Sequence, residues 1–177
     1  MSRELSSRYS RPVRDGVDEI LDQWARERPD LDASPMGIVG RISRLAAVWE
    51  RAIAATLATH GLQRDEFDVL ATLRRHGPPH RLTPTQLRAS MMVTSATTTH
   101  RLDKLEQRGL VERLPDPTDR RGVLVALTAA GLRLVDDAVV DHLATEEALL
   151  ATIDAAERRR LAGLLRTLLG STPVPPS

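Results

Sequence analysis

The chain has 177 residues, 41% of them apolar and 28% charged, which is enough for one domain with helical extensions around a buried core. Aromatic residues make up only 2%, too few for a sheet-rich fold, so a mainly helical protein is expected. The absence of cysteine excludes disulfides, zinc–thiolate sites and thiol chemistry. No apolar run reaches the roughly 18 residues of a membrane span, and no export signal is recognisable, so a cytoplasmic protein without membrane contact is expected.

The net charge of +1 is unevenly distributed. From Arg81 to Arg121 there are eight basic residues against five acidic ones, whereas from Gly122 onward five arginines stand against seven acids. A mildly basic middle segment suggests an element that faces an anion, although an arginine-rich composition produces such a fluctuation by chance as well.

Two helices are expected in residues 11–60, after a polar stretch at 1–10 that is expected to be disordered. Apolar residues at three-and-four spacing predict the first helix from Pro12 to Glu27. The second starts at Ser34 and keeps one apolar face for about six turns, until Gly61. A helix this long in so small a chain usually needs a partner.

The middle of the chain, 61–128, predicts three further helices and two strands. One helix is expected over 65–75, and a capping box from Thr83 to Gln86 opens a brief one. Thr94 caps a third helix that ends before Gly109. The β-prone runs 110–114 and 123–127 then flank a loop rich in turn-forming residues.

The last part, 129–170, predicts two helices before a tail at 171–177. Thr128 caps the first of them, and Asp154 with Glu157 forms the capping box of the second. The order of helix, short helix, helix and two-stranded ribbon is that of a winged helix-turn-helix, so the fold class is mainly α with a small β-ribbon wing.

The physical requirements of DNA binding fit this arrangement. A helix fills the major groove of double-stranded DNA, and small hydroxyl and cationic side chains near its N-terminal end contact base edges and phosphates. The alternative is that these threonines cap or pack, as we expect for Thr98, and that the charged helix face is merely solvated. The candidate DNA-binding residues of the helices are Thr85, Ser95, Thr97, Thr98, His100, Arg101 and Lys104.

Three spaced segments resemble the signature of MarR-type transcriptional regulators. They are Leu105 to Arg113 (LEQRGLVER), Asp116 to Arg121 (DPTDRR) and Leu127 to Gly131 (LTAAG). The resemblance covers about Asp65 to Gly131 and implies that Asp119 orients an arginine of the wing while Arg121 enters the minor groove, with Arg120 beside it. A cation at a loop tip suits the electronegative narrow groove, although an exposed turn with incidental charges remains the alternative.

The same resemblance implies that the terminal helices interlock two copies of the chain. Such a homodimer places two recognition helices about one turn of DNA apart, so it binds a pseudo-palindromic operator. The expected function is a ligand-responsive DNA-binding transcriptional regulator, a repressor released by a small anionic effector.

A narrower resemblance concerns the effector. Trp24, Asp68, Arg101 and Arg113 match places that the urate-responsive branch of the family associates with purine binding. An indole stacks on a purine, a carboxylate accepts from ring N–H groups, and arginine pairs with an anionic oxygen. The resemblance therefore implies urate or a related purine such as xanthine. The alternatives are that Trp24 belongs to a core, that Asp68 pairs locally, and that both arginines serve regulators without a purine ligand.

Other function classes find little support. No phosphate-binding glycine loop, nucleophile elbow or pair of catalytic carboxylates is present, so no enzyme and no cofactor is expected. His76 and His80 have helical spacing, but the intervening Gly77-Pro78-Pro79 forbids a helix between them. A metal-sensing regulator and a constitutive DNA-binding or architectural protein without effector remain the alternatives.

Overall fold

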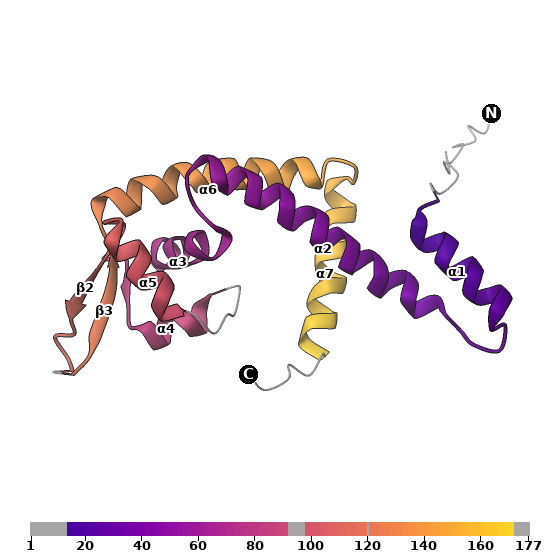
Figure 1. Cartoon of the computed structure of the whole chain (residues 1–177), viewed down its shortest axis with the longest axis horizontal. Helices are drawn as coiled ribbons and strands as arrows, with labels where there is room; N and C mark the ends of the chain where they lie inside the picture. The colour runs from indigo at the N-terminus through magenta and orange to yellow at the C-terminus, as the bar shows by residue number, and fades with distance from the viewer. Residues whose placement is uncertain (1–13, 92–97, 120, 172–177) are drawn as a thin grey trace, which may run out of the picture. The chain divides into compact units, whose positions relative to one another are not determined.

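The computed structural model describes residues 14–91, 98–119 and 121–171. The chain divides into two compact units, and the boundary falls after Glu50, within a helix. Figure 1 labels the elements, and the described residues confirm the mainly helical class with a small antiparallel sheet.

The first unit holds α1 (Gly16–Glu27) and the first part of α2 (Ser34–Thr59). Helix α1 begins at Gly16 and not at Pro12, because the Asp15 side chain accepts hydrogen bonds from the backbone N–H groups of Val17 and Asp18. From α2, Arg41 donates to Asp15 at 2.9 Å and to Asp18 at 2.7 Å. These ion pairs join the start of α1 to α2.

The second unit holds the remaining elements. They are α3 (Arg64–Arg75), β1 (Arg81–Leu82), α4 (Pro84–Ser90), α5 (Thr98–Gln107), β2 (Val111–Pro115), β3 (Val123–Leu127), α6 (Ala129–Leu149) and α7 (Ala155–Ser171). The capping boxes expected at Thr83 and Asp154 are confirmed: Thr83 accepts from the Gln86 N–H, and Asp154 accepts from the Glu157 N–H.

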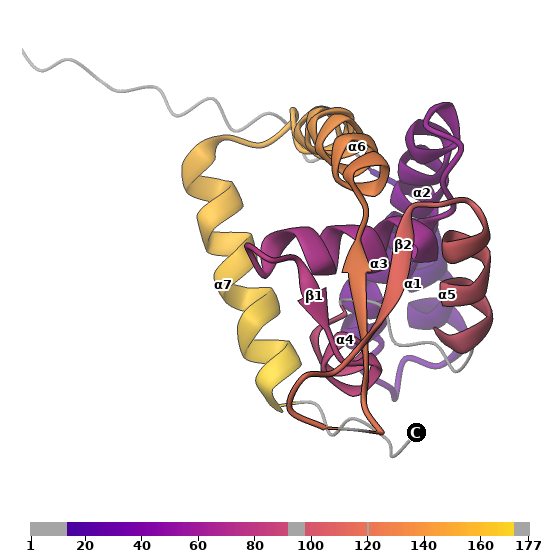
Figure 2. The same ribbon diagram turned by 90° about the vertical axis from the view of Figure 1, so that its left-hand side faces the viewer.

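The sheet has three strands in the order β1-β3-β2, where the sequence predicted only two. In the ribbon, Val111 pairs with Leu127 and Pro115 with Val123. The additional strand β1 pairs Leu82 with Val125. Two residues are too short for an alternating pattern, so no periodicity could reveal β1. Figure 2 shows this sheet with α5 beside β2 and α6 continuing from β3.

The core of the second unit lies between α3, α4, α5, the sheet and the start of α6. Its fully buried side chains include those of Leu57, Leu70, Leu73, Leu87, Leu105, Val125 and Val135. Five of them, Leu57, Leu70, Leu73, Leu105 and Val135, lie on the apolar faces that the helical spacing predicts. The packing fixes α5 against α3 on one side and against β2 on the other.

The start of α6 touches the turn that follows α5. Thr128 donates its hydroxyl to the carbonyl of Gly109 at 2.7 Å and accepts from the Gly131 N–H at 3.0 Å. A Cβ atom at Gly131 would lie 2.0 Å from the Leu110 carbonyl oxygen, so only glycine permits this approach. The LTAAG segment is therefore a packing motif that anchors α6 to the end of α5.

Helix α7 contrasts with this core, because none of its residues is buried. Its apolar side chains at Leu161, Leu164, Leu168 and Leu169 are all exposed, as are Val140 and Leu143 of α6. Among the described residues no helix is both long and apolar enough to cross a membrane. An amphipathic helix that leaves a leucine-rich face uncovered is typical of a surface that binds another protein.

Candidate nucleic-acid interface

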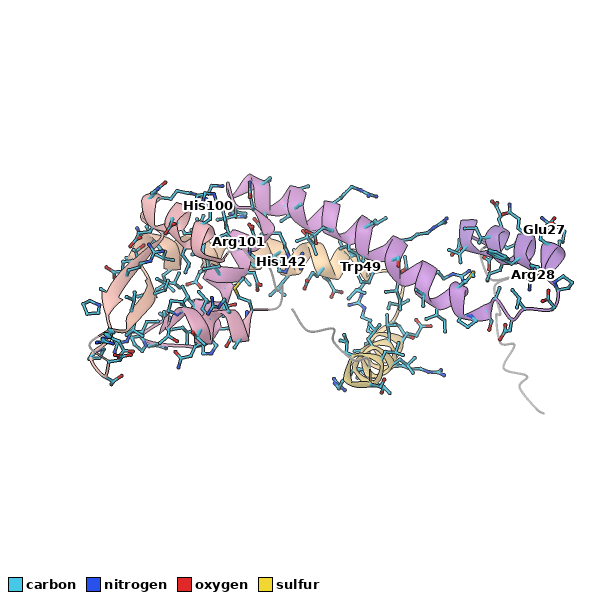
Figure 3. All side chains as sticks on the ribbon, turned by 60° about the horizontal axis from the view of Figure 1, so that its bottom comes forward. Glu27, Arg28, Trp49, His100, Arg101 and His142 are labelled. Carbon is cyan, nitrogen blue, oxygen red and sulfur yellow. The ribbon has the colours of Figure 1, made fainter. Side chains whose placement is uncertain are left out.

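Helices α4 and α5 form the helix-turn-helix, and α5 is in the position of the recognition helix. The candidate residue Thr85 is exposed on α4, and His100 is exposed on α5. Figure 3 labels His100 next to Arg101 on this helix. Ser95 and Thr97 lie outside the described residues. Thr98 is the first described residue of α5, and its side chain also lies outside the description.

The loop between β2 and β3 is held in shape by backbone and side-chain hydrogen bonds. Asp119 accepts from the Arg121 backbone N–H at 2.9 Å through its carboxylate, and from the Gly122 N–H at 2.8 Å through its carbonyl. Arg121 is exposed beside this turn, whereas Arg120 lies outside the described residues. Asp119 therefore shapes the turn at Arg121 through backbone hydrogen bonds, and its role in orienting an arginine of the wing stays a prediction.

Two acids at the start of α3 face two cations of α5 and the arginine that follows this helix. Asp65 lies 2.5 Å from Arg101, while Glu66 lies 2.9 Å from Lys104 and 3.0 Å from Arg108. We call these ion pairs the α3 clamp. The clamp borders a cleft of about 160 Å³ that is lined by Gln63, Asp65, Glu66, His100, Arg101 and Lys104.

Arg113 of β2 holds the other side of α5. Its guanidinium lies 2.6 Å from Asp103 and also pairs with Glu106, and its backbone N–H donates to Glu106 at 3.2 Å. We call this set the β2 clamp. The two clamps join the recognition helix to α3 and to the wing, so the three elements are coupled electrostatically as well as by packing.

Glu66 is the most deeply buried member of these clamps, with 2% of its side chain exposed. Burial by itself raises the pKa of this carboxyl group, but the Gln63 N–H, Lys104 and Arg108 outweigh burial and hold its pKa below the ordinary value. Glu66 is therefore ionised at neutral pH, and it acts as the anionic partner of Lys104 in α5 and of Arg108, which follows α5.

The four candidate ligand residues lie in different surroundings. Trp24 is 39% exposed on α1, where it lines a shallow depression with Gln23 and Glu27. Asp68 is buried in α3, 4.0 Å from the guanidinium of Arg75.

Arg101 and Arg113, the other two candidates, belong to the clamps. The structure thus brings Arg101 together with Asp65, and Arg113 together with Asp103 and Glu106. Sequence reasoning did not identify these acids as partners. The one available signal was their helical spacing, with Asp103 and Glu106 three residues apart on one face of α5.

The histidines do not gather into a metal site. Within the described ranges, no group of three or more histidine or acidic side chains could hold a metal ion. His142 of α6 instead stacks at an angle against Phe67, with ring centroids 4.8 Å apart, and lies 3.2 Å from Glu146. His60 lies 2.8 Å from Asp141 and links the end of α2 to α6.

A short helix, a recognition helix and a two-stranded wing around one core define a winged helix-turn-helix DNA-binding protein. The family model described as "MarR family" matches residues 62–123. The regulator PecS from Dickeya dadantii is 40% identical over 149 residues, which are 84% of this chain and 90% of PecS. The chain therefore belongs to the MarR family of DNA-binding transcriptional regulators.

Solved structures agree with this assignment. A mutant of MarR from Escherichia coli, solved in complex with operator DNA, is 27% identical to this chain with a TM-score of 0.66. The match covers 88% of this chain and 99% of that one. BpsR from Bordetella bronchiseptica, whose DNA binding is regulated by 6-hydroxynicotinic acid, is 25% identical with a TM-score of 0.68, over 76% of this chain and 94% of BpsR. These matches are transcriptional regulators and not enzymes, as the sequence predicted.

Proposed function

We propose that the protein is a cytoplasmic repressor that binds a pseudo-palindromic operator as a homodimer and is released by a small anionic ligand. The observation that carries this proposal is the contrast within the second unit between a fully packed DNA-binding lobe and the uncovered leucine face of α7. A second copy of the chain is the natural cover for such a face, because a twofold dimer matches a palindromic site.

In this proposal α5 enters the major groove and the wing reaches the adjacent minor groove. His100 and the partly exposed Lys104 lie on α5, and the exposed Arg121 lies in the wing loop. Arg101 is mostly buried in its pair with Asp65, so it contributes to DNA binding chiefly by holding α5 on α3. The exposed Thr85 at the start of α4 contacts a phosphate in this proposal.

Sedimentation and salt titration test this part of the proposal. Neutralised phosphates release counterions, so the logarithm of the operator affinity is expected to fall linearly with the logarithm of the salt concentration. The chain is expected to sediment as a dimer at micromolar concentration. A monomer, or binding that does not respond to salt, would contradict the proposal.

The proposed ligand is a small, planar anion, with urate or a related purine such as xanthine favoured. Trp24, Asp68, Arg101 and Arg113 supply stacking, acceptor and cationic groups that suit it. The 6-hydroxynicotinic acid that regulates BpsR is also a planar, heteroaromatic anion, which supports the chemical class. It does not single out purines.

The clamps suggest how such a ligand would lower DNA affinity. An anion that pairs with Arg101 competes with Asp65, and one that pairs with Arg113 competes with Asp103 and Glu106. Either exchange loosens α5 from α3 or from β2. Ligand binding and DNA binding are then linked, with a coupling free energy of about 1–3 kcal/mol.

Titration of purines, followed by tryptophan fluorescence and by operator release, tests the ligand. Asp68→Ala is expected to weaken binding strongly because a buried polar partner is lost, and Trp24→Phe only mildly. Both purines are tested up to about millimolar concentration, where even weak binding is detected. If neither urate nor xanthine changes the fluorescence or releases DNA, the purine assignment is wrong. A metal-dependent rise in melting temperature would instead favour a metal-sensing regulator. If the protein responds to no effector at all, a constitutive DNA-binding protein is favoured.

A further inference from the structure

The carboxylate of Glu66 contacts three donors from two separate segments. Its Oε2 atom accepts from the Gln63 backbone N–H at 2.9 Å and from Arg108 at 3.0 Å, and its Oε1 atom lies 2.9 Å from the Lys104 ammonium. Lys104 lies in the last turn of α5 and Arg108 directly follows the helix, four residues later, so a single buried anion faces both cations. Arg108 also donates to the Gly61 carbonyl at 3.0 Å, which fixes its direction.

The group of Glu66, Lys104 and Arg108 carries a net charge, unlike the neighbouring pair of Asp65 and Arg101. Asp65 and Arg101 cancel each other, whereas Glu66 leaves one net positive charge on the pair Lys104 and Arg108. Both cations remain partly exposed, with 45% and 32% of their side chains accessible. The buried carboxylate is little screened by salt, so it reduces the field of α5 under all ordinary buffer conditions.

Capping of α3 does not require this charge. Glu66 is the third helical residue of a capping box, and either glutamate or glutamine fills that role by accepting from the Gln63 N–H. Burying a carboxylate costs more free energy than burying an amide. A charged side chain at this place is therefore explained by its action on Lys104 and Arg108 and not by the cap.

We propose that Glu66 is a specificity-determining residue of the DNA-binding lobe, acting through Lys104 and Arg108. It holds these two side chains in fixed directions and cancels one of their charges, so sequence-independent attraction to phosphates is weakened while α5 keeps one position. The inference rests on the proposed function, in which α5 faces DNA. Glu66 itself touches no DNA and is a positioning residue.

The direct test is Glu66→Gln, which preserves the shape of the side chain and the acceptor of the capping box. An operator is selected by the wild-type protein from random duplexes, and affinities for it and for random DNA are measured across a salt series. Glu66→Gln is expected to bind random DNA about tenfold more tightly at low salt, with the log–log salt slope steeper by about 0.9, the value for one additional phosphate contact. The ratio of operator to random affinity is expected to fall about fivefold to tenfold.

Asp137→Asn is the matched control for net charge, because Asp137 is exposed on α6 and its loss raises the charge by the same amount. It is expected to leave the affinity ratio and the salt slope unchanged. Melting curves by circular dichroism show that each variant is folded before binding is measured. A purely structural role of Glu66 would lower the melting temperature without steepening the salt slope.

Lys104→Met, at a partly exposed position, supplies a second and independent test. It is expected to cost more affinity for random DNA in the Glu66→Gln background than in the wild type, because Glu66 no longer engages the ammonium. Equal costs in the two backgrounds would overturn the inference. If the wild type binds its operator selectively and Glu66→Gln has the same slope and ratio, only the role of Glu66 fails. If the wild type does not discriminate between sequences, both proposals fail.

Discussion

Helices α5 and α7 belong to the same compact unit, yet they use their leucines in opposite ways. Helix α5 buries Leu102 and Leu105 and is held by the α3 and β2 clamps. Helix α7 buries none of its side chains, although it is longer and has four exposed leucines. The comparison shows where the free energy of folding of the monomer is concentrated: the recognition helix is fixed within one chain, whereas α7 is covered only in the proposed dimer.

The strongest expected effect is on the packed side of this comparison. Leu105→Ala should lower the free energy of unfolding by about 2–5 kcal/mol, because the side chain is fully buried and a cavity remains. Urea denaturation measures the loss. The volume-conserving Leu105→Met serves as the control and should cost less than about 1.5 kcal/mol. A loss below that for the alanine variant would mean that α5 is not part of the core.

The exposed leucine face of α7 is tested by introducing charged side chains into it. The double variant Leu161→Glu with Leu164→Glu places two carboxylates on exposed positions, so the fold of the monomer should remain intact by circular dichroism. The dimer dissociation constant should rise by about 100-fold or more, the scale of hot-spot residues, because charges are then buried in the proposed interface. Sedimentation velocity over a concentration series measures it. Persistence of the dimer would place the interface elsewhere.

A smaller effect is expected at the wing, which contributes to reading and not to packing. Arg121→Ala should reduce operator affinity by about 1–3 kcal/mol and leave the melting temperature unchanged, since Arg121 is exposed. Gel-shift titration measures the affinity, with exposed Arg133→Ala of α6 as the control. Equal affinities for the two variants would remove Arg121 from the interface.

The smallest expected effect is the pH dependence of the melting temperature. It reports on the ion pairs of the α3 clamp and not on the leucine face of α7. Because the folded state lowers the pKa of Glu66, its ionised form stabilises the lobe above the ordinary value of 4.5. This contribution is lost as the pH falls through the lowered pKa. Melting temperatures of the wild type and Glu66→Gln should therefore differ at neutral pH and converge in acid. A constant difference at all pH values would show that ionisation of Glu66 does not stabilise the fold.

The sequence predicted the elements well where one local pattern governs them. Capping residues such as Thr83 and Thr128 and the apolar spacing of α2 identified the helices, because both signals operate within a few residues. Strand β1 was missed because its two residues pair with β3 through tertiary contact alone. The start of α1 was placed at Pro12, before the Asp15 cap that opens the helix at Gly16.

The candidate site was less predictable. The cations at α5 are visible in the sequence, but their carboxylate partners lie on α3, as far as 42 residues away along the chain. Arg113 of β2 pairs instead with two acids of α5, 10 and 7 residues before it. No spacing rule connects Lys104 with Glu66, since only the packing of α5 on α3 brings them together. Arg101 and Arg113 were singled out for a ligand, and the structure shows that the same two guanidinium groups are already engaged by carboxylates.

The close approach of Gly131 to the Leu110 carbonyl couples the orientation of α6 to the turn that follows α5. Without a Cβ atom between them, the helix packs directly on the turn that follows α5, so we expect its first residues to follow a rotation of that turn. Helix α6 ends at Leu149, about 27 Å from Gly131 at about 1.5 Å per residue, so a tilt of about 5° at Gly131 moves its far end by about 2 Å. The absence of a side chain at Gly131 therefore links a small movement at the end of the recognition helix to a larger displacement at the far end of α6.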